Sequence, residues 1–153
     1  MEKKKIIFIL SAGRSGSTLV DKLIGSSVNC FSLGEIGLSN DYFERNVICS
    51  CGEYLNKCPF WSKIDKEFDF KSDTNIQLSY HYSSKFLKYI NFLKVLTYLV
   101  FNINILPKKM LNSLQNTKKL YFSISNNLNE NIFIDSSKNV LRALLLTKFL
   151  KNN

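Results

Sequence analysis

Ten residues near the N-terminus, SAGRSGSTLV at positions 11–20, combine residue types that bind anions. Gly13 and Gly16 permit a tight turn whose backbone comes close to a ligand. Arg14 adds a planar, permanently charged guanidinium, and Ser17 or Thr18 begins a helix whose first N–H groups have no partner within the helix. Such a turn binds tetrahedral anions through its amides and the positive end of the helix. The residues expected to bind the anion are Gly13, Arg14, Ser15, Gly16, Ser17 and Thr18.

The residues of this loop allow two other interpretations. A glycine turn with a serine helix cap needs neither the arginine nor both glycines. A nucleoside-triphosphate loop has more widely spaced glycines and a lysine before its Ser-Thr pair, which Gly13, Gly16 and Ser17 do not match. A nucleotide kinase or nucleotide hydrolase with a variant loop is therefore the first rival, and such an enzyme would need magnesium.

Two charged residues stand at positions where they could act on a ligand of this loop. Glu35 follows a short apolar segment, and a carboxylate there could accept a proton from a hydroxyl. In IDSSK at 134–138, Ser136 and Lys138 lie at a second turn between an apolar segment and a helix. The alternatives are a solvated glutamate in the first case and, in the second, a helix cap with a solvated lysine.

Three cysteines follow in a C-x-C-x₆-C arrangement: Cys49, Cys51 and Cys58. This spacing matches no standard zinc motif, even with Cys30 as a fourth ligand. The sequence therefore predicts no metal ion. It predicts instead thiols buried near the Phe-Trp pair at 60–61 or, in an exported protein, one disulfide.

The elements that must position these residues alternate between strands and helices. Residues 6–10 are continuously apolar, which is typical of a strand buried on both faces, and a helix is expected from the turn to Gly25. Segments 29–35 and 131–135 predict two more strands. The apolar residues that indicate the first and last helices are Leu19, Val20, Leu23, Ile24, Leu141, Leu144, Leu145 and Phe149. This alternation predicts an α/β fold with a parallel sheet and right-handed crossovers, in which ligands bind beyond the carboxyl ends of the strands.

Residues 63–130 carry no assignable motif. Residues 40–62 predict an irregular segment, and residues 76–127 predict basic helices interrupted by Pro107. His81, the only histidine, is expected on a helix surface rather than as a base. The helices fit either a lid that guides an anionic or lipidic acceptor or a plain solvated face. Their expected core-facing stripe is Phe86, Leu87, Ile90, Leu93 and Leu96.

Length and composition limit the class of protein. A chain of 153 residues with 45% hydrophobic content fits one globular domain, and a net charge of +9 favours an anionic partner. The apolar run after MEKKK is too short for a secretion signal. Residues 95–106 fall short of the roughly 18 uninterrupted apolar residues of a membrane span. We therefore expect a cytoplasmic protein with reduced thiols.

Four segments of the chain carry a resemblance: IFILSAGRSGSTLVDKLIGSS, SLGEI, CSCGEYLNKCPFW and IDSSK. In this order they resemble the bacterial members of the sulfotransferase family, which use 3′-phosphoadenosine 5′-phosphosulfate (PAPS), over residues 5–62 and 131–150. The resemblance implies a P-loop-like fold with a helical insertion, a loop that holds the 5′-phosphosulfate with Arg14 where other branches have lysine, and Ser136 among the donor-binding residues. It further implies Glu35 as the base for the acceptor hydroxyl, Lys138 near the transferring sulfonate, and no metal.

The predicted function is sulfonate transfer from PAPS to a hydroxyl or amine of a carbohydrate, lipid or small molecule, with no nucleic-acid partner. The predicted catalytic residues are Arg14, Glu35 and Lys138. Relatives of this kind continue past DSSK into a strand and an Arg-Asp-Pro-Arg-like turn that grip the 3′-phosphate. The resemblance therefore implies a C-terminally truncated chain, whose unpaired, apolar first strand would favour self-association. A truncated nucleotide-binding remnant without activity is the second rival.

Overall fold

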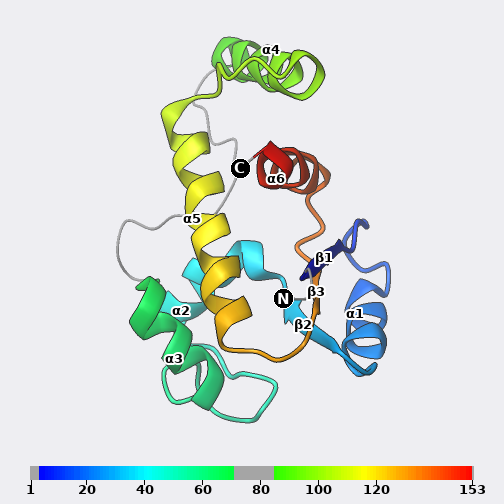
Figure 1. Ribbon diagram of the computed structural model, residues 1–153, viewed down its shortest axis with the longest axis vertical. Coiled ribbons are helices and arrows are strands. Elements are labelled where there is room, and N and C mark those ends of the chain that lie inside the picture. Colours follow the sequence, from blue (N-terminus) through cyan, green and yellow to red (C-terminus); the bar gives the residue numbers. More distant parts are fainter. Residues whose placement is uncertain (1–3, 71–84, 153) are drawn as a thin grey trace.

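The computed structural model describes residues 4–70 and 85–152 and shows an α/β fold. Its sheet has three parallel strands, β1 (Lys5–Phe8), β2 (Cys30–Gly34) and β3 (Ile132–Asp135). The strand order is β1-β3-β2, so the last strand in sequence lies in the middle (Figure 1). The parallel α/β class and the three strand positions were predicted correctly. His81, predicted on a helix surface, lies outside the described residues.

The register of the sheet places the carboxyl ends of its three strands at the same level. Phe8 of β1 and Gly34 of β2 are both opposite Asp135 of β3. The pairing of β2 is irregular between Ser32 and Gly34. Since all strands run in the same direction, the loop after β1, the residue after β2 and the turn after β3 leave the sheet at a common edge.

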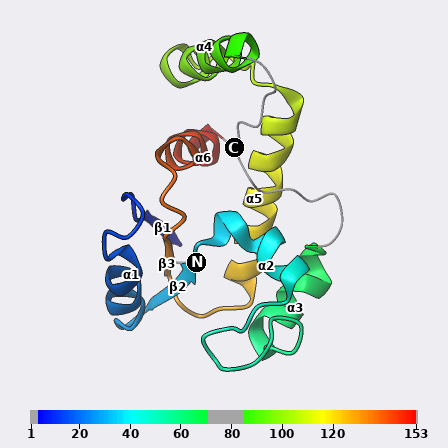
Figure 2. The ribbon, with the colours of Figure 1, turned by 180° about the vertical axis from the view of Figure 1, so that it is seen from behind.

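Helices surround the sheet. Helix α1 packs on β2 and β3, and α5 lies on the other side of the sheet (Figures 1 and 2). Helix α3 packs on α5, and α4 and α5 both contact α6. The helices are α1 (Ser17–Gly25), the 3₁₀ turn η1 (Ile36–Leu38), α2 (Ser39–Arg45), α3 (Pro59–Phe68), α4 (Lys85–Phe101), α5 (Lys108–Asn126) and α6 (Val140–Asn152).

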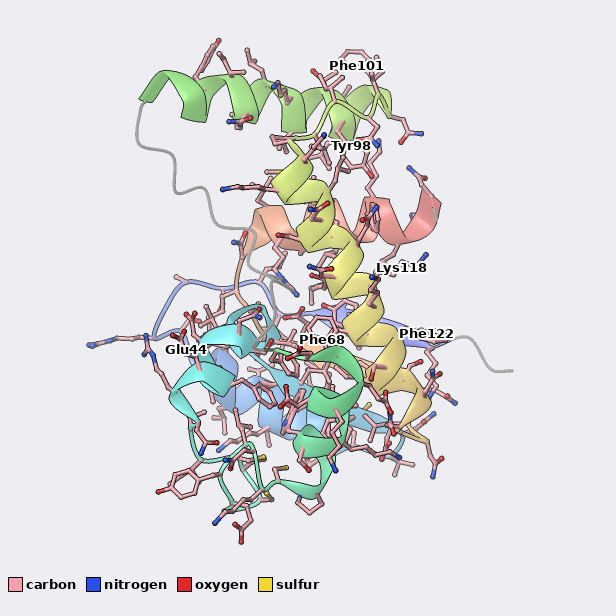
Figure 3. All side chains as sticks on the ribbon, turned by 90° about the vertical axis from the view of Figure 1, so that its left-hand side faces the viewer. Glu44, Phe68, Tyr98, Phe101, Lys118 and Phe122 are labelled. Atoms are coloured by element: carbon pink, nitrogen blue, oxygen red, sulfur yellow. The ribbon has the colours of Figure 1, made fainter. Side chains whose placement is uncertain are left out.

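The hydrophobic core is formed by the sheet together with residues of α2 to α6. Phe68 and Tyr98 are among its buried aromatic side chains, whereas Phe101 and Phe122 lie at the surface (Figure 3). The fully buried aliphatic residues are Ile64, Leu114, Leu120, Ile124, Ile134, Leu145 and Leu146. None of the helices in the described part of the chain has both the length and the hydropathy needed to cross a lipid bilayer.

The first strand and first helix differ from the prediction in their burial. β1 is an edge strand whose residues alternate between exposed and half-buried, so it is not buried on both faces. In α1 the apolar residues that indicate the helix do not form a buried face: Leu19 and Leu23 are 63% and 61% exposed, and Val20 is exposed as well. The residues of α1 that are buried are Ser17 and Asp21. The cause is the position of α1 over β2 and β3, where Asp21 accepts a hydrogen bond from the Ser32 hydroxyl.

Two other segments also differ. The segment predicted to be irregular contains α2 and the start of α3, so only residues 46–58 lack a helix. In α4, Leu93 and Leu96 of the expected stripe are exposed and Ile90 is half-buried, while Asn91, Val95 and Tyr98 are buried; the side chains of Phe86 and Leu87 lie outside the described part of the chain. Apolar residues occur on all sides of this helix, so their spacing does not single out one face. In α6, Leu145 and Phe149 are buried, whereas Leu144 is exposed.

Candidate functional site

The loop between β1 and α1 is an exposed turn with free hydrogen-bond donors. Arg14 (φ 61°) and Gly16 (φ 81°) have left-handed backbones on either side of Ser15, a geometry that points successive N–H groups into one concavity. Gly16 is the N-cap of α1, and no side chain caps the first N–H groups of this helix. No N–H group of residues 13–18 donates to another described residue. The loop therefore presents several donors, with the Arg14 guanidinium, to an anion.

Glu35 and Lys138, 103 residues apart in sequence, form an ion pair. Glu35 directly follows β2 and Lys138 follows β3, so the pairing of these two strands brings them together. Their side chains are 30% and 23% exposed, respectively. The Lys138 ammonium has three hydrogens, so it can bind Glu35 and still donate to an anion.

Ser136, predicted to bind the donor, is instead an interior residue. It is 3% exposed, and its backbone N–H donates to the carbonyl of Gly34 at 2.9 Å. The next residue, Ser137, accepts a hydrogen bond from the N–H of Gly37 at 2.8 Å and donates its hydroxyl to Asp135. These bonds tie the turn after β3 to the turn after β2.

A buried charged cluster under this turn was not found by sequence reasoning. Asp135 pairs with Arg142 and accepts a hydrogen bond from the Tyr121 hydroxyl, and all three side chains are buried. Burial and the Asp135 carboxylate raise the pKa of Tyr121 well above 10.0, so it remains a donor. Arg142 Nε and Nη2 have no partner among the described residues. The signal in the sequence was an arginine within the otherwise apolar segment VLRALLL.

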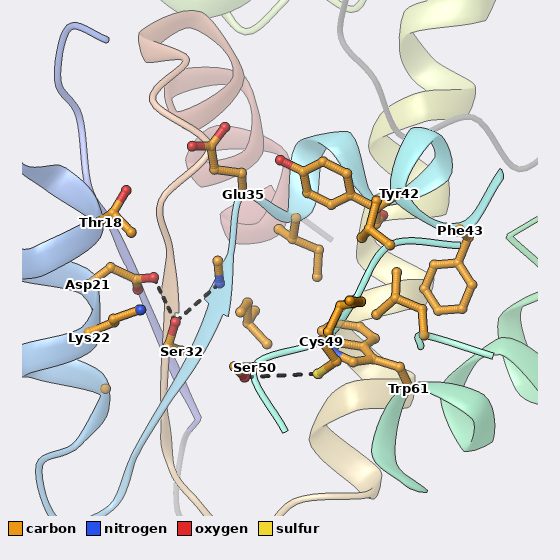
Figure 4. Close-up of a pocket in the computed structure, with 18 of the residues that line it drawn as sticks. Thr18, Asp21, Lys22, Ser32, Glu35, Tyr42, Phe43, Cys49, Ser50 and Trp61 are labelled. Atoms are coloured by element: carbon orange, nitrogen blue, oxygen red, sulfur yellow. Dashed lines mark hydrogen bonds between the residues drawn. The ribbon is translucent and has the colours of Figure 1, made fainter. Parts of the chain in front are cut away.

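A pocket of about 560 Å³ lies between α1, β2, α2 and the cysteine segment (Figure 4). Of the predicted site residues, Thr18 and Glu35 line it, whereas Arg14, Ser136 and Lys138 do not. The Tyr42 hydroxyl points toward Glu35 (Figure 4). Burial, followed by the charge of Glu35, raises the pKa of Tyr42 above 10.0, which keeps its proton available for a hydrogen bond. Tyr42 was missed because α2 was predicted to be irregular.

The three cysteines of residues 49–58 meet at one end of this region. Their Sγ atoms all lie within 4.8 Å of one another. Cys58 is buried, Cys49 half-buried and Cys51 exposed, so burial of the thiols was correctly predicted only for Cys58. Burial raises the pKa of the Cys58 thiol, helped by hydrogen bonds with Cys49 and Cys51. Burial also acts to raise the pKa of Cys49, but hydrogen bonds from the Cys51 backbone and from neighbouring side chains lower it overall.

The fold and these groups define an α/β protein with a donor-rich loop and an ion pair at the carboxyl edge of its parallel sheet. Comparison of the chain with protein-family models, with curated proteins and with solved structures found no match.

Proposed function

We propose that the chain is a sulfotransferase domain with a P-loop-like fold, which binds PAPS and transfers its sulfonate to a hydroxyl or amine acceptor. The observation that carries the proposal is the common edge from which the loop of residues 13–18, Glu35 and Lys138 emerge. The proposal includes a cytoplasmic location, where thiols stay reduced, and an acceptor that is a carbohydrate, lipid or small molecule rather than a nucleic acid.

Donor binding is assigned to the loop between β1 and α1. The phosphate and sulfate oxygens of PAPS are hydrogen-bond acceptors, and the free N–H groups of residues 13–18 and the Arg14 guanidinium are donors. Each charge-assisted hydrogen bond contributes about 1.5–3 kcal/mol. The loop is exposed, and a Cβ added at Gly13 or Gly16 would meet no atom within 4 Å, so there is room for the donor's 5′-phosphosulfate.

Transfer is assigned to Glu35 and Lys138. The acceptor oxygen attacks sulfur in line, a new O–S bond forms, and the S–O bond to the 5′-phosphate breaks, with adenosine 3′,5′-bisphosphate as the leaving group. Glu35 takes the proton of the acceptor, and Lys138 donates to a sulfonate oxygen as negative charge spreads over the group. No metal ion is used in this step.

The acceptor site is assigned to the pocket beside Glu35. Its volume of about 560 Å³ lies within the range of small-molecule sites, about 300–1,000 Å³. Tyr42 would donate a hydrogen bond to the acceptor or to Glu35, while Phe43 and Trp61 provide apolar contacts deeper in the pocket. An acceptor with one reactive hydroxyl and an apolar remainder fits this lining.

Calorimetric titration with adenosine 3′,5′-bisphosphate tests the donor site. The native chain should bind without magnesium, and Arg14→Ala should weaken binding at least about 10-fold, as expected for one charged hydrogen bond. Arg45→Ala, at the exposed end of α2, is the matched control and should bind as the native chain does. Magnesium-dependent binding of ATP without binding of the bisphosphate would favour a variant-loop kinase. Binding of the bisphosphate without sulfonate transfer from labelled PAPS to a panel of acceptors would favour an inactive nucleotide-binding remnant.

A further inference from the structure

A small hairpin and the N-terminus of α3 bring the three cysteines of residues 49–58 together. A bridge between Ile48 and Tyr54 closes a small hairpin, in which Cys49 donates its N–H to Glu53 at 2.8 Å and accepts from Gly52 at 2.9 Å. Gly52 has φ 91°, a backbone that favours glycine, and this lets the chain turn directly after Cys51. Cys58 is the N-cap of α3, followed by Pro59. The hairpin turn with Cys49 and Cys51 therefore lies next to the N-terminus of α3, where Cys58 is located.

The sulfur geometry is close to that of a metal site. With Zn–S bonds of about 2.3 Å, two thiolates of a tetrahedral zinc ion lie about 3.8 Å apart. Cys49 and Cys58 Sγ are 3.6 Å apart, and no pair among the three exceeds 4.8 Å. The pairs that include Cys51 are at most 4.8 Å apart, and Cys51 is exposed, so its side chain has the most room to move. Cys30, at the start of β2, is not part of this group of the described residues.

We propose that Cys49, Cys51 and Cys58 bind a zinc ion, with the fourth coordination position open on the side of the exposed Cys51. The three thiols lose their protons on binding, so the site carries one net negative charge. Cys58 is the N-cap of α3, so the positive end of this helix opposes the negative charge. Zinc suits this site because it accepts thiolates in a tetrahedral arrangement and has no redox chemistry.

The zinc ion has a structural role next to the pocket. Cys49, Ser50 and Trp61 line the pocket described above, so the ion fixes the wall that these residues form. Residues 46–58 contain no helix, and they are held by the small hairpin, the start of α3 and the burial of Leu55 and Cys58. A crosslink through three cysteines adds to this limited packing. This inference is independent of the proposed sulfonate transfer.

The test is metal analysis of the full chain, purified with a phosphine reductant and no chelator. Zinc should be present in equimolar amount, and replacement by Co²⁺ should give the charge-transfer and visible bands of tetrahedral cobalt thiolate. Cys51→Ser removes an exposed ligand and should weaken zinc binding by at least about 100-fold, because even loss of a supporting hydrogen bond costs about 10–100-fold. Cys30→Ser is the matched control and should keep the native affinity. Removal of zinc should change the fluorescence of Trp61, the only tryptophan.

Four results would overturn the proposal. The first is a reduced native chain that contains no zinc and gives no cobalt thiolate spectrum, and the second is equal zinc affinity of Cys51→Ser and Cys30→Ser. The third is copper(I) in place of zinc in the isolated protein. The fourth is a Cys49–Cys58 disulfide in protein isolated from cells with its thiols blocked. None of these depends on donor binding, so failure here and failure of the sulfotransferase proposal are distinguishable.

Discussion

Replacing Asp135 by asparagine is expected to destabilise the fold strongly. Asp135 is 1% exposed and Arg142 is 2% exposed, so the substitution leaves a guanidinium charge in the interior without its carboxylate. The remaining partner of Arg142 is the Tyr121 hydroxyl at 3.5 Å. Removing one partner of a buried pair costs about 3–5 kcal/mol, a large share of the roughly 5–15 kcal/mol of a typical domain.

Arg142→Met should cost less than Asp135→Asn, although it breaks the same ion pair. Without Arg142, Asp135 still accepts hydrogen bonds from the Ser137 N–H, the Ser137 hydroxyl and the Tyr121 hydroxyl. The substitution also removes two arginine nitrogens that have no partner among the described residues. The double variant should therefore be more stable than Asp135→Asn alone, because it removes the uncompensated charge.

Urea unfolding at pH 7, followed by circular dichroism, measures these differences. Glu35→Gln is the matched control, since it breaks an ion pair of the same type that is 23–30% exposed and is expected to change stability by about 0–1 kcal/mol. Equal losses for Asp135→Asn and Glu35→Gln would refute the argument from burial. A larger loss for Arg142→Met than for Asp135→Asn would refute the argument from the remaining donors.

Three further outcomes are expected. Glu35→Gln should lower the rate of sulfonate transfer by about 10²–10⁴-fold with little change in bisphosphate affinity. The control Glu44→Gln, at an exposed position, should change neither quantity. Equal losses of rate and affinity in Glu35→Gln would assign Glu35 a structural role. Hydrogen bonds from Ser123 and Asn127 lower the pKa of Glu67 below 4.5, so its carboxylate stabilises the fold above that pH and this contribution is lost as the pH falls through the lowered pKa. Glu67→Gln should thus be less stable than the native chain in urea at pH 7, and the difference should shrink as the pH falls through the lowered pKa; a constant difference would contradict this. Finally, light scattering should detect association of the native chain through the edge strand β1, and Ile7→Lys should reduce it; unchanged association would place the contact elsewhere.

The sequence predicted those parts of the fold that local pattern determines. Strands 30–34 and 132–135 and helix 17–25 follow from apolar runs bounded by glycine, serine and charged residues. The strand order β1-β3-β2 depends on contacts between residues about one hundred positions apart, which no local pattern contains. The orientation of α1 could not be predicted for a related reason, since it depends on the hydrogen bond between Asp21 and Ser32 across two elements.

The residues of the candidate site were predicted one by one, but the hydrogen bonds and the buried ion pair that hold them together were not. Glu35 and Lys138 were chosen separately, and they meet because Ser137 joins the two turns that carry them through its bonds to Gly37 and Asp135. Asp135 is in turn fixed by Arg142 and Tyr121 below the turn. We expect the buried ion pair to hold the partly exposed one in position. The folded fraction of Asp135→Asn should then show weaker sulfonate transfer as well as lower stability. A variant that is less stable yet fully active at low temperature would separate the two ion pairs and leave the buried one a purely structural part.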